Sequence, residues 1–335
     1  MNVKDTLDRW GLTPIHRIVL GLDEGKLDEH LRLYFDLREK RDWQGRTPLH
    51  WAAIRGNHEI LQTLVTFKVD PSAPDMDQIT PLHLAANYSS VECVNVLLEA
   101  GANPNAVSHY LSTPLHFAVR GRPREGTVRA LIIHGANLEI KDKYGQTALY
   151  FALVNNCIQI VPTLLELGAN IEAEDKMGIT PVQACVKLCH AGMIRFLRNH
   201  GARMDHINGT GNNILHIAAS YADNETLIAL DHDSVVGLTP VEKNSDGKTP
   251  EALLKERCEM SVVTETTRSL FRTLLVRCRG RPSNEVDGGD TESTDSNEDG
   301  SPMEATWESQ SFDDEHDEDI DKFYDTVQEI TLEDS

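Results

Sequence analysis

The stretch GRTPLHWAAIRGNHEI, which runs from Gly45 to Ile60, contains the tetrad TPLH at residues 47–50. Taken alone, the tetrad is ambiguous, because a hydroxyl lies three residues before an imidazole and three is a helical spacing. Such a pair could belong to a catalytic site or could hold the backbone in place. The rest of the chain decides between these two interpretations.

The tetrad recurs at an almost constant interval. Its copies, some of them degenerate, begin at Thr13, Thr47, Thr80, Thr113, Thr147, Thr180 and Asn213. Successive copies start 34, 33, 33, 34, 33 and 33 residues apart, and a further degenerate copy follows at Thr249. An enzyme has no use for several copies of one active site at a fixed spacing, whereas a solenoid is built from one repeated unit. The period therefore indicates a solenoid.

One unit predicts two helices. Thr47 is a good N-cap, and Pro48 suits the first helical position because its missing N–H costs nothing there. In the third copy a second helix reads VECVNVLLEAGANPN, with Val94, Leu97 and Leu98 at the spacing of a buried stripe. This helix and its later equivalents are predicted to stop at a glycine, which tolerates left-handed backbone angles. The stops are Gly101, Gly135, Gly168 and Gly201.

The motif T-P-L-H-x-A-A, a glycine break and a helix that ends in G-A-N, repeated about every 33 residues, closely resembles the ankyrin repeat. The resemblance covers roughly residues 11 to 277. It implies an all-α solenoid of about seven helix-turn-helix repeats plus a degenerate C-terminal cap, with hairpin-like fingers between repeats. We place the solenoid at residues 1–282, its cap at 247–277, and the repeat starts near residues 11, 45, 78, 111, 145, 178 and 211.

The resemblance gives the tetrad a structural role, in which its Thr and His bond each other and the adjoining loop backbone. The motif residues of the three complete copies are Thr47, Pro48, His50, Thr80, Pro81, His83, Thr113, Pro114 and His116. His16 and His216 match the histidine position, whereas Tyr150 and Gln183 depart from it, so repeats five and six are expected to be looser. We expect no catalytic residue among them.

The end of the chain has a different composition. Residues 283–335 hold 20 acidic residues and one lysine, a net charge of −19, which leaves −2 of the total −21 for the first 282 residues. Such a stretch cannot bury enough surface to fold alone, so we predict a disordered acidic tail. Within it, apolar residues at helical spacing suggest a helix that forms on a partner, with a merely solubilising tail as the alternative. They are Ile320, Phe323, Tyr324, Val327 and Ile330.

Several functions are made improbable by the sequence. The acidic balance argues against direct nucleic-acid binding, and no apolar run is long enough to span a bilayer. The first residues lack a signal peptide and the six cysteines are scattered, so we expect an intracellular protein, cytoplasmic or nuclear. Cys185, Cys189 and His190 have a possible metal-binding spacing, but Cys185 falls where other repeats have a core alanine. We therefore expect no metal, no cofactor and no enzyme activity.

Two basic segments allow more than one interpretation. Arg120, Arg122 and Arg124 belong to a solvated loop or to an anion-binding patch. The segment SVVTETTRSLFRTLLVRCRGRP is either the cap of the stack or a basic amphipathic helix for a membrane or a helix-binding partner. We favour the solvated loop and the cap.

The expected function is non-catalytic protein binding by a monomeric scaffold or adaptor. The resemblance places the binding surface on the concave face, formed by the finger tips and the inner helices. Aromatic and arginine side chains are the usual anchors of such surfaces. The candidate contacts are Trp43, Arg46, Arg55, Met76, Tyr88, Tyr110, Arg120 and Tyr144. The alternative is a transcriptional or signalling regulator whose acidic tail recruits a second partner or inhibits the concave face.

Overall fold

The computed structural model describes residues 10–88, 90–120, 124–231, 235, 238–260 and 263–279. All of them belong to one compact unit, Leu7–Arg281. The predicted acidic tail at 283–335, with its apolar positions from Ile320 to Ile330, lies outside the described residues.

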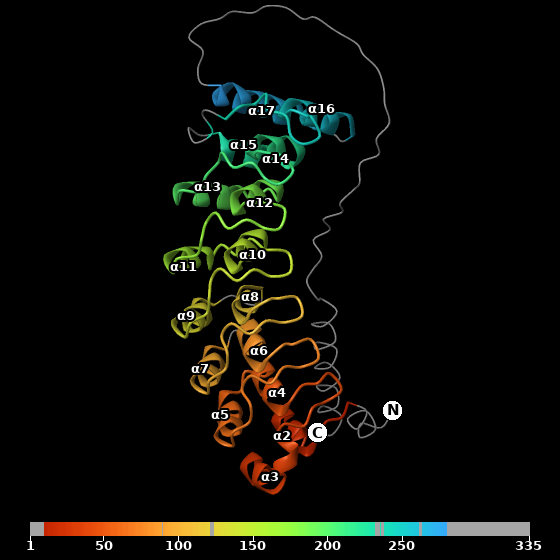
Figure 1. The fold of residues 1–335 in the computed structure, drawn as a ribbon, viewed down its shortest axis with the longest axis vertical. Helices are drawn as coiled ribbons and strands as arrows, with labels where there is room; N and C mark the ends of the chain where they lie inside the picture. Colours follow the sequence, from red (N-terminus) through yellow and green to blue (C-terminus); the bar gives the residue numbers. More distant parts are fainter. Residues whose placement is uncertain are drawn as a thin grey trace, which may run out of the picture. The chain divides into compact units, whose positions relative to one another are not determined.

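Within the described ranges the regular structure is helical and contains no β-strand. The helices form two columns, an inner and an outer one (Figure 1). The inner column consists of α2 (Pro14–Leu20), α4 (Pro48–Ile54), α6 (Pro81–Asn87), α8 (Pro114–Arg120), α10 (Ala148–Val154), α12 (Pro181–Lys187), α14 (Ile214–Tyr221) and α16 (Pro250–Met260). The outer column consists of α3 (Leu27–Leu33), α5 (His58–Thr66), α7 (Val91–Glu99), α9 (Glu125–Ile133), α11 (Val161–Glu166), α13 (Ala191–Asn199), α15 (Asn224–Leu230) and α17 (Glu265–Cys278).

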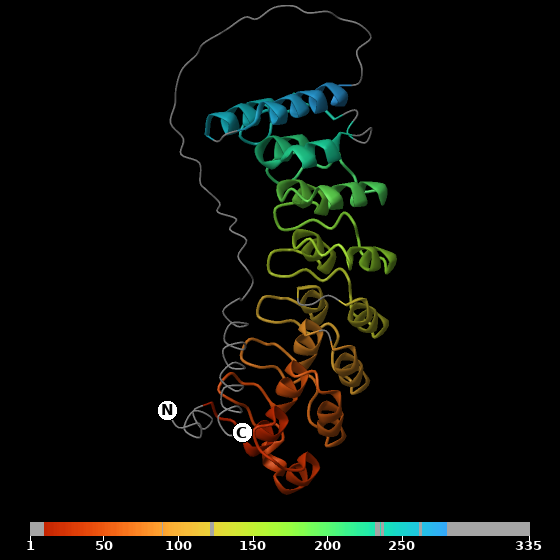
Figure 2. The same cartoon turned by 180° about the vertical axis from the view of Figure 1, so that it is seen from behind.

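The columns are held together by contacts between neighbours in the stack. Each inner helix packs against the next inner helix. In the outer column, successive helices pack against each other from α3 to α9 and again from α13 to α17. A short 3-10 helix, η1 (Phe35–Leu37), follows α3. The loops that project beside the inner column are seen from the opposite side in Figure 2. This arrangement confirms the predicted all-α repeat solenoid.

The inner helices are fixed at their N-termini by the tetrad. Thr47 has extended backbone angles (φ −86°, ψ 167°), and Thr47 and His50 form a reciprocal capping box at the start of α4. Pro48 occupies the first turn, as the sequence predicts. Helices of about seven residues are too short to persist alone, so their stability comes from packing. The small side chains of Ala52 and Ala53 are completely buried and let the inner helices approach closely.

The outer helices end as the glycine pattern predicts. The last helical residue of α7 is Glu99, and Gly101 then takes a φ of +91°. The amide of Ala102 turns back to the carbonyl of Leu97 at 2.9 Å, which closes the helix end. A Cβ built on Gly101 would meet no atom within 4 Å, so the glycine is required by its backbone angle rather than by crowding.

Candidate protein-binding surface

The loops between repeats are tight fingers, and all of the described fingers from two to eight except finger four are braced by one side chain. In finger two (residues 42–46) the Oδ1 atom of Asp42 accepts the amide hydrogens of Gln44 and Arg46, both at 2.9 Å. The same pair of bonds recurs in finger three (75–79), finger five (142–146), finger six (175–179), finger seven (208–212) and finger eight (244–248). The bracing residues there are Asp75, Asp142, Asp175, Asn208 and Asn244.

Backbone hydrogen bonds join successive fingers into one continuous row, which we call the finger row. In each bond a tip residue donates its amide hydrogen to a tip carbonyl of the preceding finger, at 2.8–3.1 Å. The donors along the row are Trp43, Met76, His109, Lys143, Lys176, Gly209 and Ser245. Because these seven residues make the same bond, they occupy equivalent positions in the row.

The tetrad histidines tie the inner helices to the fingers. The Nδ1 atom of His50 accepts the Thr47 amide hydrogen at 3.0 Å, so its Nε2 carries the proton and donates to the Ile79 carbonyl at 3.1 Å. His16, His83, His116 and His216 make equivalent contacts. In this structure the tetrad is a structural device, and its histidine nitrogens are engaged by backbone groups.

Burial keeps these histidines neutral. Desolvation lowers the pKa of His50 to about 3, against a hydrogen bond to the Ile79 carbonyl that raises it. The pKa of His83 falls to about 4 for the same reason. Burial also lowers the pKa values of His16, His116 and His216. A neutral imidazole with a fixed tautomer is what the two bonds of each histidine require.

The side chains at the two departures from the histidine pattern still bond the next repeat. The hydroxyl of Tyr150 donates to Asp175 Oδ2 at 2.8 Å. The side-chain amide of Gln183 donates to the His206 carbonyl at 2.9 Å. The expectation that repeats five and six are looser is therefore wrong for this contact, because a different side chain makes an equivalent bond.

Several predicted contact residues lie in the finger row. Trp43 and Met76 are exposed, at 47% and 64% of their surface. Tyr110 and Tyr144 are half-buried and share a lysine, since the Lys143 Nζ atom lies 3.3 Å from the Tyr110 ring centroid and 5.0 Å from that of Tyr144. The row thus brings together an aromatic and cationic group that is typical of interface anchors.

Other predicted contacts lie at the C-terminal ends of inner helices. Arg55 is exposed, but its Nη1 atom also donates to the Leu20 carbonyl at the end of α2. Tyr88 and Arg120 are half-buried, and the Arg120 guanidinium carbon lies 5.7 Å from the Phe117 ring centroid. Arg55 and Tyr88 directly follow α4 and α6, and Arg120 is the last residue of α8.

Arg46 does not fit the predicted role, because it is only 2% exposed. Its Nε atom lies 3.7 Å from Asp75 Oδ2, and its guanidinium carbon lies 5.4 Å from the Trp51 ring centroid. The chain turns inward after Gly45, which has a φ of +79°. Arg46 is therefore a buried contact between fingers two and three. The prediction that it belongs to the contact surface is wrong.

The sequence did not single out Lys143 and Lys176 as anchors, although both occupy the same tip position as Trp43. It also passed over Val107 and Leu111 around finger four (residues 108–112), which are 42% and 47% exposed. The 33-residue period aligns both lysines with Trp43, so their tip positions could be read from the sequence. They were not chosen as anchors because anchors were expected to be aromatic or arginine side chains.

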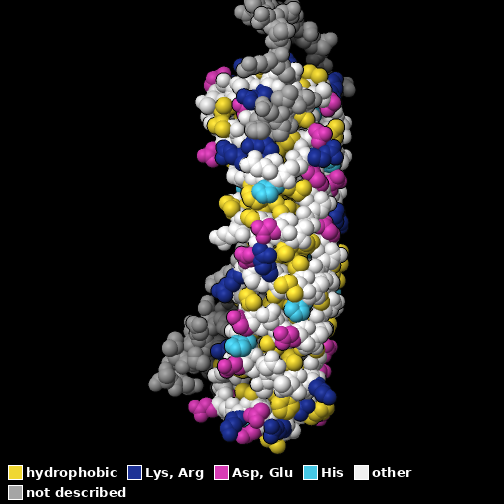
Figure 3. All heavy atoms as spheres, turned by 90° about the vertical axis from the view of Figure 1, so that its left-hand side faces the viewer, with side chains coloured by type: hydrophobic (Ala, Val, Ile, Leu, Met, Phe, Trp, Pro, Cys, Tyr) yellow, Lys and Arg dark blue, Asp and Glu magenta, His cyan; other side chains and the backbone are white. Residues whose placement is uncertain are grey.

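The outer-column face is mixed in charge. Figure 3 shows acidic and basic side chains interspersed with apolar ones on this face, rather than separated into patches of one sign. Arg129, for example, pairs with Glu125 at 2.6 Å and with Glu166 at 3.0 Å. Arg122 lies outside the described residues, and Arg124 is exposed. Because its charges are mixed and partly paired, the outer face is a less suitable surface for one specific partner than the finger row is.

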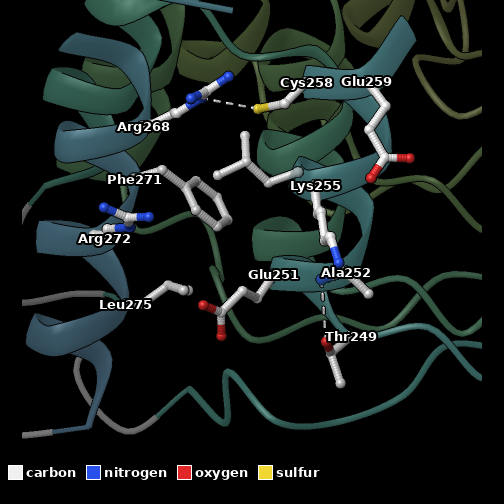
Figure 4. Close-up of a pocket in the computed structure, with 11 residues that line it drawn as sticks. Thr249, Glu251, Ala252, Lys255, Cys258, Glu259, Arg268, Phe271, Arg272 and Leu275 are labelled. Carbon is white, nitrogen blue, oxygen red and sulfur yellow. Dashed lines mark hydrogen bonds between the residues drawn. The ribbon is translucent and has the colours of Figure 1, made fainter. Parts of the chain in front are cut away.

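A cleft of about 570 Å³ lies between α16 and α17, the last pair of helices that the structure describes (Figure 4). Phe271 and Leu275 form an apolar floor, whereas Lys255, Glu259 and Arg272 are exposed. A polar outer face on a terminal repeat is what a solenoid needs to stay soluble. The cleft corresponds to the stacking surface that a further repeat would cover.

The candidate metal ligands of the sequence do not meet. Cys185 is buried, the Cys189 thiol lies 3.3 Å from the Tyr221 carbonyl, and His190 Nδ1 donates to the Leu153 carbonyl at 3.0 Å. Over the described ranges, no group of three His, Cys, Asp or Glu side chains is placed to hold a metal ion. No helix among those described is both long and apolar enough to cross a membrane.

Comparison with known proteins gives a consistent result. A family model described as "Ankyrin repeats (3 copies)" matches residues 15–108 and 107–175. The ankyrin repeat domain of Bcl-3, described as a unique member of the IkappaB protein family, superposes with a TM-score of 0.60 at 26% identity, covering 66% of this chain and 98% of that one. The human ASB11 ankyrin repeat domain gives 0.58 at 25% identity, covering 71% and 100%.

No curated protein matches the sequence. Ankyrin repeats are generally protein–protein interaction modules, and their fold is typically non-catalytic. The repeated tetrads, the paired helices, the family match and the two structural neighbours all agree. The chain is an ankyrin repeat protein.

Proposed function

We propose that the protein is a non-catalytic scaffold or adaptor whose protein partner contacts the finger row and the adjoining ends of the inner helices. The observation that carries this proposal is the continuity of the row, in which backbone bonds link successive fingers while Trp43 and Met76 stay exposed. A rigid backbone frame needs little ordering on binding, so the entropy cost is limited to the side chains that make contact. In this proposal the protein acts as a monomer inside the cell, in the cytoplasm or nucleus, and does not bind nucleic acid directly.

The test is affinity capture of cellular proteins with the intact chain and with the double variant Trp43→Ala/Tyr110→Ala. Loss of an aromatic anchor costs about 2 kcal/mol or more, so partners of the finger row should be retained at least about thirtyfold less well. The matched control is Tyr34→Ala/Phe35→Ala, which removes two exposed aromatic side chains near η1, at 44% and 70% exposure. Equal capture by both double variants would reject the proposed surface.

The regulatory alternative concerns residues 283–335, which lie outside the described residues. It stays a prediction from composition: the tail recruits a second partner or inhibits the concave face. Removal of these residues should raise partner affinity in the inhibitory version, most strongly at low salt.

A further inference from the structure

The side chains at equivalent tip positions change character along the finger row. Fingers two and three present Trp43 and Met76, whereas fingers five and six present Lys143 and Lys176. Between them finger four presents His109, which is exposed and bonds the Met76 carbonyl at 2.9 Å. The row therefore runs from apolar to cationic.

The carboxylates of the cationic fingers are turned inward. Asp142 and Asp175 are 3% and 8% exposed, and each braces its own finger by accepting two amide hydrogens. Asp175 also accepts the Tyr150 hydroxyl, and Glu174 Oε1 lies 3.6 Å from His206 Nε2. A partner that approaches the tips of fingers five and six therefore meets Lys143 and Lys176 rather than Asp142 and Asp175. The Glu174 carboxylate, just before finger six, keeps 47% of its side chain exposed beside His206.

The first of these ammonium groups is held in place. Lys143 Nζ lies 3.3 Å from the Tyr110 ring centroid, close enough for a cation–π contact. Beyond the fingers, Lys187 at the end of α12 lies 5.5 Å from the Tyr221 ring centroid. Partial burial lowers the pKa of Lys187, while the nearby Asp175 acts in the opposite direction. An anion brought to this region by a partner would offset the cost of that burial.

We infer that the finger row binds an extended acidic segment of a partner protein. An apolar side chain of the segment lies on Trp43 and Met76, and its carboxylates lie on Lys143 and Lys176. This inference rests on the proposed function and specifies the chemistry of the partner. Four repeat steps of about 10 Å separate fingers two and six, so the segment covers about 40 Å. About 12 residues in extended form span that length.

The inference can be tested by fluorescence anisotropy with the full chain and a labelled peptide of about 26 residues, in which about 12 extended residues on either side of the centre reach about 40 Å. The peptide has Trp-Leu at its centre and Glu on both sides, so that either chain direction places Glu on fingers five and six. Its analogue has Gln in place of Glu. At low salt we expect the Glu peptide to bind about tenfold more tightly than the Gln analogue, and the difference to shrink as salt is added.

The variant Lys143→Glu/Lys176→Glu should weaken binding of the Glu peptide by about tenfold or more. The control Lys68→Glu/Arg195→Glu makes the same change in charge at two exposed sites, one after α5 and one on α13. It should alter binding by less than about twofold. Circular dichroism and Lys143→Gln/Lys176→Gln, which should give an intermediate loss, show that the effect is not misfolding.

Equal binding of the Glu and Gln peptides would overturn the inference, and so would equal losses in the two charge-reversal variants. The outcome is separable from that of the proposed function. If a cellular partner is lost in Trp43→Ala/Tyr110→Ala but fully retained in Lys143→Glu/Lys176→Glu, the finger row binds proteins and the acidic chemistry assigned to the segment is wrong.

Discussion

At the scale of single residues, the tetrad histidines couple the stability of this protein to pH. His50 and His83 have pKa values of about 3 and 4 in the folded chain, whereas an unfolded histidine titrates near 6.5. Between these pH values the unfolded chain therefore binds more protons than the folded chain does. The contribution of each histidine to the free energy of unfolding is complete above about pH 6.5 and is lost as the pH falls below it. Protonation would also remove the acceptor on Nδ1 that closes the capping box.

We predict that the free energy of unfolding falls by about 1.4 kcal/mol for each of these two histidines between pH 7.5 and pH 5.5. Chemical denaturation at the two pH values measures the loss. Approach to the isoelectric point near 5.0 acts in the opposite direction, because it reduces repulsion between acidic groups. A single variant separates the two effects.

The separating variant is His83→Gln, because Gln183 already fills the histidine position of its own repeat and bonds the His206 carbonyl in the next repeat. It should fold at pH 7.5 and should lose about 1.4 kcal/mol less than the original chain on acidification. An unchanged pH dependence in His83→Gln would show that the buried imidazole is not the titrating group.

At the scale of elements, finger four (residues 108–112) has neither an Asp or Asn brace nor a glycine at its left-handed position, whereas finger three, with Gln78 at a φ of +61°, still has its Asp75 brace. Ser108 stands where the other fingers have Asp or Asn, and its buried Oγ atom has no hydrogen-bond partner. Leu111 adopts a φ of +59°, an angle that finger two reaches with Gly45. A left-handed angle costs a side chain about 1 kcal/mol or more. Strain of this kind is often retained where a surface binds.

We predict that Leu111→Gly raises the free energy of unfolding by about 0.5–1 kcal/mol, because it relieves the left-handed angle. Adding Ser108→Asn should supply the missing turn bonds to the amides of Tyr110 and Ser112 and raise it further. The reciprocal control is Gly145→Leu in finger five, where a Cβ would lie 2.6 Å from the Lys176 amide nitrogen. Thermal denaturation should show a loss there, and a gain in Gly145→Leu would contradict this explanation.

The sequence predicted the helices well because their signals are local. The Thr-Pro start of α4 and the glycine after α7 each act within one turn. The resemblance placed the finger tips on the binding surface, but the backbone bonds that join the fingers were not predicted, because they join residues about 33 positions apart and depend on how the repeats stack. The burial of Arg46 was missed for a related reason. The Arg46 side chain lies against Asp75 and Trp51 after the turn at Gly45, whose positive φ the sequence alone does not show.

At the scale of the whole stack, stability is built from contacts between neighbouring repeats. Such an array responds to damage according to position, since each repeat is supported only by the repeats beside it. Leu131 in α9 and Leu274 in α17 are both completely buried, yet Leu131 has neighbours on both sides and Leu274 lies in the last pair. The same substitution at these two sites should therefore have different consequences for the finger row.

We predict that Leu274→Ala and Leu131→Ala each remove about 2–5 kcal/mol of local stability, as truncation of a buried leucine does. In Leu274→Ala the loss should be confined to α15–α17, so hydrogen exchange speeds up there while the finger row keeps its protection and its partner. In Leu131→Ala exchange should rise in the fingers on both sides of α9, and partner binding should fall, because the row is interrupted at its centre. Equal exchange profiles in the two variants would mean that the stack unfolds as one cooperative unit, and the finger row would then depend on its cap.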